Sequence, residues 1–239
     1  MPRMCKGCGQ RRLLQTAAAA TSATSSAPTR TPTTPLPPHH YKPCAPAAPP
    51  IMGLPSATTA RANSHFTPDH ALQNNERIAL VDPRLATNLA DKSAHTLRAI
   101  HTPGHAANHV CLLLEEDGLL FSGDHILNGS TTIIDPPDGH MGDYLDSLDL
   151  LHTLCMEHGA QHILPAHGHP LPDALQAISH LKAHRLRREA KIAAIMQAHP
   201  EGNLATWLPL AYDDVDPSLH PIARRSMLAH VERIQGMNL

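Results

Sequence analysis

A succession of short apolar runs broken by tight turns, over residues 96–124, constrains the fold of this chain more than any other feature. The first run ends in a Thr-Pro-Gly turn that presents His105, and two further runs, 109–115 and 119–122, flank a Glu-Asp-Gly turn. Proline and glycine interrupt regular backbone, so His105 is expected in a loop at a strand end. The second turn predicts that the two later runs pair as a hairpin.

The rest of the chain predicts further strands and then helices. Apolar residues at helical spacing are followed by breakers such as Gly159 and Pro200, which end the predicted helices. The expected strands lie at 66–69, 77–81, 96–100 and 161–165, and the expected helices at 144–158, 172–199, 204–211 and 217–235. This order predicts an α/β (α+β) body followed by a small helical unit of helix-turn-helix character.

The charge distribution divides the chain. Residues 1–68 carry seven Lys or Arg and no acid, whereas residues 69–239 carry twelve against twenty-one acids. Residues 1–50 consist largely of Ala, Ser, Thr and Pro without apolar periodicity, so we expect them to be a disordered low-complexity segment. A transit peptide is the alternative for an Arg- and Ser-rich, acid-free start. Cys5 and Cys8 have metal-ligand spacing but lack a second such pair.

The composition argues against a membrane-spanning protein and against a disulfide-stabilised one. No run of about 18 apolar residues exists, so no membrane span is expected. Five irregularly spaced Cys predict no disulfide framework and favour a reducing compartment, the cytoplasm. The chain has an unusually large number of histidines, twenty, and many of them are expected on the surface.

Three strand ends carry residues that bind metals. His105 follows Thr-Pro-Gly, Asp124 follows Ser-Gly and His167 follows Pro-Ala, so a small residue near each leaves room for a ligand. Imidazole and carboxylate are zinc ligands, and a bound zinc ion lowers the pKa of its water to about 7. The alternative is three ordinary polar residues on loops.

The motifs T-P-G-H, S-G-D and P-A-H-G, in this order, resemble the metallo-β-lactamase (MBL) superfamily of metal-dependent hydrolases. Together with H-T-P-G-H-A-A-N-H, F-S-G-D-H-I-L-N-G-S-T-T and H-R-L-R-R-E-A-K-I, they resemble its β-lactamase-like-protein-2 branch over about residues 55–239. The resemblance implies an αββα sandwich at 51–180, incomplete at its N-terminal part, and a winged-helix-like domain at 181–239. A family name does not imply a β-lactam substrate.

The resemblance also implies a dizinc centre. His105 would bind one zinc ion, His167 the other, and Asp124 would bridge both, so that a shared hydroxide attacks a carbonyl or phosphoryl centre. His109 matches a histidine near the family's site, where it would orient a ligand, but a surface role is equally open. His125 should point away from the metal, and two further His, His101 and His140, are expected on the surface.

The family's first motif, H-x-H-x-D-H, is absent, so no catalytic residue is assigned. His65 and His70 flank Asp69 at the wrong spacing. We hypothesise a frameshift: threonine codons begin AC, so a frame starting one base earlier reads His, Asn, Asp or Tyr. In Pro28–Pro35 the threonines stand at the spacing of the four missing ligands, and H-T-H-T-D-H-S-P is a permitted shifted translation. Either way, three of seven ligands predict weak zinc binding and little hydrolysis.

Two function classes remain open. The first is a zinc-dependent hydrolase of an ester, thioester or RNA phosphodiester, with a small-molecule or RNA substrate and with a homo-oligomer possible. The second is a catalytically inactive relative that acts as a binding module through its helical tail. The basic run Lys182–Lys191 is expected to be the solvated face of a helix, with phosphate contact as the alternative.

Overall fold

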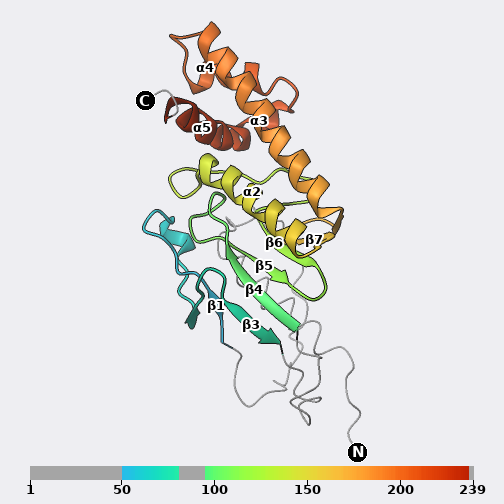
Figure 1. The fold of residues 1–239 in the computed structure, drawn as a ribbon. Helices are drawn as coiled ribbons and strands as arrows, with labels where there is room; N and C mark the ends of the chain where they lie inside the picture. The colour runs from blue at the N-terminus through green and yellow to red at the C-terminus, as the bar shows by residue number, and fades with distance from the viewer. Residues whose placement is uncertain (1–49, 81–94, 237–239) are drawn as a thin grey trace, which may run out of the picture.

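The computed structural model describes residues 50–80 and 95–236. Among them, six strands form one mixed sheet in the order β3-β4-β5-β6-β7-β8, and two short strands pair separately (Figure 1). The strands of the large sheet are β3 (Arg77–Leu80), β4 (His95–His101), β5 (Val110–Leu114), β6 (Leu119–Gly123), β7 (His162–Pro165) and β8 (Leu171–Pro172). The short pair is β1 (Met52–Gly53) and β2 (His70–Ala71).

Connection length decides the direction of each strand pair. Only four residues join β5 to β6, which run antiparallel, and Gly118 in this turn has a φ of 59°. Strand β7 pairs parallel to β6, because helix α2 (Met141–Glu157) crosses over between them. The carboxyl ends of β6 and β7 therefore meet at the same edge of the sheet, where Asp124 and His167 follow.

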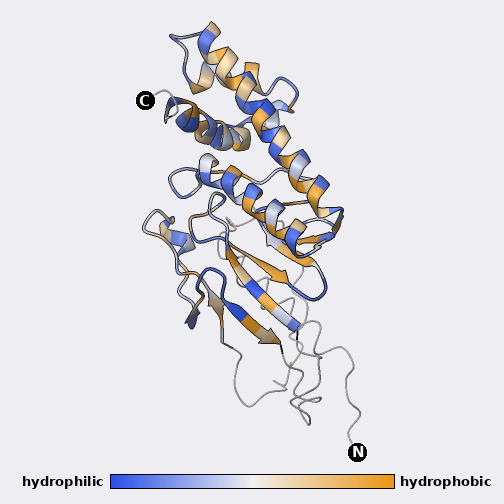
Figure 2. Cartoon of the chain, in the orientation of Figure 1, coloured by the Kyte–Doolittle hydropathy of each residue, from blue (hydrophilic) through white to orange (hydrophobic). Residues whose placement is uncertain are grey.

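The large sheet is buried on both faces. Helices α2 and α3 (Ala174–Ala198) cover one face through a core that includes Leu113, Leu120 and Tyr144. The alternate residues Val110 and Leu112 face the other side, in a second cluster with Leu72 and, at its margin, residues of the β1 segment. Apolar residues accordingly run continuously along β5 (Figure 2). The described residues contain one sheet-and-helix half of the predicted αββα sandwich.

The C-terminal helices form their own core beside α2. Helix α4 (Leu204–Ala211) starts at Asn203, whose side chain accepts hydrogen bonds from two backbone amides, and α5 (His220–Gly236) follows the short 3-10 helix η2 (Pro217–Leu219). Helix α3 belongs to both cores, with Ile178 in the first and Ile192 in the second. The predicted boundary at 180/181 thus falls inside a continuous helix, and the domain division and the winged-helix label stay predictions.

Most of the predicted elements lie where the sequence places them. The strand expected at 66–69 is wrong: this segment is irregular, because the Phe66 amide donates to Ser56 Oγ and the Asp69 side chain accepts from the Ile51 amide. The prediction of a solvated run at 182–191 is wrong for two members, since Arg185 and Glu189 are buried. The two-residue strands were too short to predict. Residues 1–49, which hold the low-complexity and frameshift predictions, and Val81 lie outside the described residues.

Two observations bear on compartment and membrane. Cys111 and Cys155 are free and buried within the described part of the chain. None of the helices in residues 50–80 and 95–236 combines the length and the apolar character that crossing a bilayer requires.

His230 makes stability depend on pH. It is fully buried between α5 and α3, and burial lowers its pKa, although the hydrogen bond to Glu189 acts in the opposite direction. The unfolded chain then binds a proton that the folded chain does not, so the free energy of unfolding falls as pH drops below about 6.5. When the pH is lowered from about 7.5 to 5.5, we expect the midpoint of thermal unfolding to fall less in His230→Phe than in the unaltered chain. An unchanged loss in that variant would exclude His230 as a source.

Candidate metal centre

His105 is held by a turn that only glycine permits. Gly104 has a φ of 129°, and a Cβ there would lie 2.3 Å from the Tyr144 Cα. The turn therefore lies directly against α2, and Ser147 Oγ donates to the Pro103 carbonyl at 2.8 Å. His105 Nδ1 lies 2.7 Å from the Ile133 carbonyl oxygen. Because a carbonyl only accepts, Nδ1 carries the proton, so that in the neutral ring Nε2 holds the lone pair.

Asp124 lies between two imidazoles at the carboxyl end of β6. Its side chain is 8 % exposed, with Oδ2 4.0 Å from His105 Nε2 and Oδ1 3.4 Å from His167 Nε2. His105 Nε2 and Asp124 Oδ1 are both buried without a hydrogen-bond partner. Buried polar atoms without partners are uncommon in folded proteins, so these two atoms point to a missing ligand.

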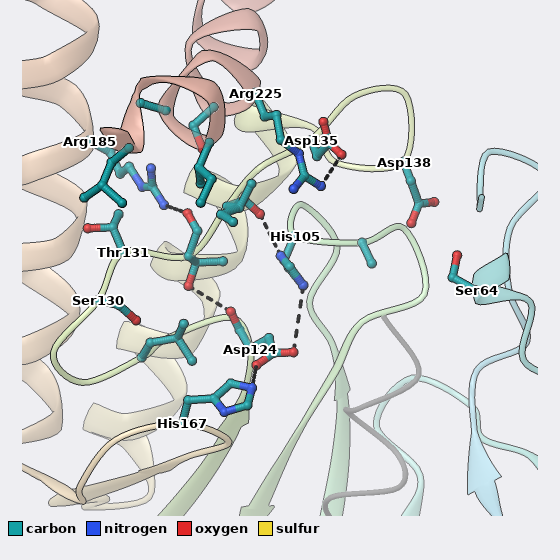
Figure 3. A pocket seen from close by; sticks show the side chains of 18 of the residues that line it. Ser64, His105, Asp124, Ser130, Thr131, Asp135, Asp138, His167, Arg185 and Arg225 are labelled. Carbon is teal, nitrogen blue, oxygen red and sulfur yellow. Dashed lines mark hydrogen bonds and ion pairs between the residues drawn. The ribbon is translucent and has the colours of Figure 1, made fainter. Parts of the chain in front are cut away.

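His167 follows β7 on a more open loop. Its side chain is 64 % exposed, so solvent reaches this end of the site. The next residue, Gly168, has a φ of 92°, and a Cβ there would lie 2.2 Å from the Asn128 carbonyl oxygen. The loop therefore packs closely on the segment after Asp124, which brings His167 towards the carboxylate (Figure 3).

The donor set fits only part of a dizinc centre. Each Asp124 oxygen faces one imidazole, which is the arrangement of a bridging carboxylate. Zinc in proteins takes four ligands, at least three of them from protein in most sites, whereas here each ion would receive one nitrogen and one oxygen. In the described residues, no group of three or more His, Cys, Asp or Glu side chains is placed to hold one metal ion. The described residues do not make a complete centre.

His109 and His125 lie under the site as buried neutral rings. The His109 ring is 6.1 Å from that of His105 and 5.3 Å from that of His125, which contacts Tyr144 at 4.4 Å. Burial lowers the pKa of His125 to about 3 and that of His109 well below its usual value. His109 is therefore no surface residue, and its Nδ1 shares a 2.8 Å hydrogen bond with the Thr102 hydroxyl. Whether it orients a metal ligand stays a prediction.

The other two predicted surface histidines differ from each other. His140 is exposed and caps α2, where its Nδ1 accepts from the Asp143 amide at 3.2 Å. His101 is half-buried, and its Nε2 lies 2.8 Å from the Ala107 carbonyl oxygen. The Ala107 carbonyl thus engages Nε2 of His101, and the Asp143 amide engages Nδ1 of His140.

Four consecutive residues, Thr132–Asp135, connect the site to the C-terminal helices. Thr132 Oγ1 donates to the Asp124 carbonyl at 2.8 Å, and the Thr132 carbonyl accepts from Arg185 of α3. The Ile133 carbonyl holds His105, as described above. Next to it, Ile134 N donates to Ser226 Oγ of α5 at 3.1 Å, and Asp135 pairs with Arg225. Residues of α3 and α5 thus contact the loop that orients His105 and hold it in place.

A cavity of about 790 Å³ opens in front of the site. His105, Asp124 and His167 lie in its wall, and the α3 and α5 residues Arg185 and Arg225 lie in the same wall (Figure 3). A volume of this size accommodates a small molecule of drug size.

Comparisons with known proteins agree with this geometry. The family model described as "Metallo-beta-lactamase superfamily" matches residues 50–154. The Caenorhabditis elegans "Beta-lactamase-like protein 2 homolog" is 38 % identical over 106 residues, which is 44 % of this chain and 33 % of that protein. A metallo-beta-lactamase family protein from Thermus thermophilus superposes with a TM-score of 0.54 at 25 % identity, covering 71 % of this chain and 50 % of that chain.

The chain belongs to the metallo-beta-lactamase superfamily. The chain is also similar to the beta-lactamase-like-protein-2 branch. The Drosophila melanogaster "Beta-lactamase-like protein 2 homolog" is 29 % identical to it over 141 residues, which is 58 % of this chain and 45 % of that protein. The "Atrochrysone carboxyl ACP thioesterase" of Aspergillus chevalieri is 33 % identical over 108 residues, 45 % of this chain and 32 % of that protein. The chain spans between about a third and just under half of the length of these curated relatives.

Sequence reasoning missed two features of this superfamily member. The Thr132–Asp135 segment carries no metal-binding side chain in its first three residues, and its contacts are largely backbone. The burial of Arg185 was missed because a basic run on a helix is usually solvated. One sequence feature could have indicated the burial of Arg185: it precedes Glu189 by four residues, so both side chains lie on one face of α3.

Proposed function

We propose that this chain is a metal-dependent hydrolase by descent, with a thioester or other ester of a small molecule as its substrate class. The observation that carries the proposal is Asp124 between the two imidazoles, with an unpartnered nitrogen and oxygen, in the wall of a cavity. Relatives named as thioesterases favour a thioester over the RNA phosphodiester that the sequence left open. Activity in a reducing compartment, the cytoplasm, is part of this proposal.

We propose further that the chain as written has little activity. His105, Asp124 and His167 would hold zinc, but they supply only three of the seven ligands that the family resemblance implies for a dizinc centre. The family resemblance implies an aspartate in the first motif that orients the water, and the sequence lacks that motif. The frameshift hypothesis for 28–35 concerns residues outside the described part, and the nucleotide sequence of the gene tests it: a shifted frame without His-x-His-x-Asp-His excludes it.

The alternative is an inactive relative that binds a partner through its helical tail. Leu210, Leu219 and Ile222 of the tail are large apolar side chains with 41 %, 50 % and 46 % exposure, which favours a contact there. Zinc content separates both proposals from a competent enzyme of this family, which would hold close to two ions per chain.

Zinc titration with a chromophoric competitor tests the centre. We expect weak binding of roughly one ion per chain or less, and a further loss of about tenfold in affinity for Asp124→Asn, because that residue supplies both oxygens. His180→Ala is the matched control, because His180 is an exposed histidine of α3 outside the cavity.

Two results would contradict these expectations. Tight binding of two zinc ions with turnover of a generic ester would show that the chain as written is competent. Equal zinc affinity in Asp124→Asn and in the control would remove Asp124 from the site.

A further inference from the structure

Arg185 is a buried cation without a carboxylate partner in the described part of the chain. The residue is 3 % exposed, its Nη2 donates to the Thr132 carbonyl, and its Nε is buried with no hydrogen-bond partner. Its guanidinium carbon lies 5.1 Å from the centre of the Tyr144 ring. Removing a charge from water costs several kcal/mol unless it is paired, so such a guanidinium calls for an anion.

A second arginine of the cavity wall, Arg225, has to share its carboxylate partner. Arg225 and Arg61 both pair with one carboxylate, Asp135, and Arg225 Nε is buried without a partner. Two other arginines of the helical tail differ: Arg188 forms two 2.8 Å hydrogen bonds with Asp214, and Arg233 pairs with Glu189. Among the described arginines, Arg185 and Arg225 are therefore the two with a buried guanidinium nitrogen that has no hydrogen-bond partner.

Both arginines lie in the wall of the cavity that contains the candidate metal centre, together with the carboxylates Asp124, Asp135 and Asp138. In Figure 3, Arg185 and Arg225 lie on one side of His105, and His167 lies on the other. The cavity is also lined by apolar side chains from the tail, Val215, Leu219, Ile222 and Ala223. The wall thus combines a cationic and an apolar surface next to Asp124.

We propose that Arg185 and Arg225 form an oxyanion subsite that holds a phosphate or carboxylate group of a small-molecule substrate. The apolar tail residues would contact the adjacent uncharged part of that substrate, and the bond to be hydrolysed would lie by Asp124. Guanidinium groups suit both anions, because their fixed donors match the oxygens of a carboxylate or a phosphate. The proposal rests on the proposed hydrolase function and narrows its substrate to anionic esters and thioesters.

Binding of inorganic phosphate, and separately of acetate, to the zinc-free chain tests the subsite without turnover. Isothermal titration at constant ionic strength should show saturable binding of one of them, weakened about tenfold or more in Arg185→Met and in Arg225→Met. Arg187→Met is the matched control, because Arg187 is exposed on the same helix two residues away. Asp124→Asn should keep the binding, which separates this subsite from the candidate metal centre.

Each further outcome decides the proposal. Equal binding in Arg185→Met, Arg225→Met and the control means an adventitious ion only, and overturns it, as does the absence of binding in the unaltered chain. If Arg185→Met fails to fold, Arg225→Met and Arg185→Lys are compared with the unaltered chain instead, and both are expected to bind the anion more weakly. Stronger competition by short single-stranded RNA than by a phosphate-bearing thioester would overturn the small-molecule assignment. Intact phosphate binding in an unaltered chain that binds no zinc at all would contradict the hydrolase function alone.

Discussion

Replacing Gly104 with alanine is expected to lower the free energy of unfolding by about 4 kcal/mol. Two effects add: alanine disfavours the φ of 129°, and its Cβ would lie 2.3 Å from the Tyr144 Cα and 2.4 Å from the Tyr144 nitrogen. These are backbone atoms of a helix whose Tyr144 side chain is fully buried, so the neighbour cannot yield by turning a side chain. Urea denaturation followed by circular dichroism measures the change.

Gly159→Ala is the matched control for Gly104→Ala. Gly159 also has a positive φ, of 62°, but a Cβ there would meet no atom within 4 Å. We expect a loss of only about 1 kcal/mol, from the backbone conformation alone. Equal losses in the two variants would show that the turn moves away from α2 at little cost. The candidate site should respond as well, because His105 follows Gly104 directly and would lose its position beside Asp124.

Replacing Glu189 with alanine is expected to lower the free energy of unfolding by about 3–5 kcal/mol. Glu189 is a buried carboxylate of α3 that lies 3.0 Å from His230 Nδ1 and pairs with Arg233, both on α5. Its removal leaves two polar groups at the α3–α5 contact without their acceptor, and His230 is completely buried. Thermal and urea unfolding measure the loss, which should be accompanied by weaker packing of α5.

Glu232→Ala is the control for Glu189→Ala, because Glu232 is an exposed glutamate of α5. We expect a change within about 0.5 kcal/mol for it, as for most surface substitutions. Similar small losses in both variants would mean that the buried cluster adds no net stability. Glu189→Gln should fall between the two, since it keeps an acceptor for His230 without the charge.

The sequence by itself determined the type and order of most elements and the three residues of the candidate centre. Periodicity, glycine and proline act over a few residues, so local patterns were enough for strands β4–β7 and helices α2–α5. His105, Asp124 and His167 stand out because each follows a strand and a small residue, and their role as metal ligands stays a prediction. The failed strand at 66–69 lies where hydrogen bonds to Ser56 and Ile51 replace a regular ladder.

Only the tertiary structure decided which polar groups are buried and what they contact. Arg185 and Glu189 belong to one charged run of a helix, and their spacing places them on one face without showing that this face, unlike that of the exposed Arg187, is buried. Their surroundings come from residues about 40 to 50 positions away: the Thr132 carbonyl for Arg185, and His230 for Glu189. Burial and pairing of charge depend on such long-range packing, which is why the cationic wall beside Asp124 emerged from the fold and not from the motifs.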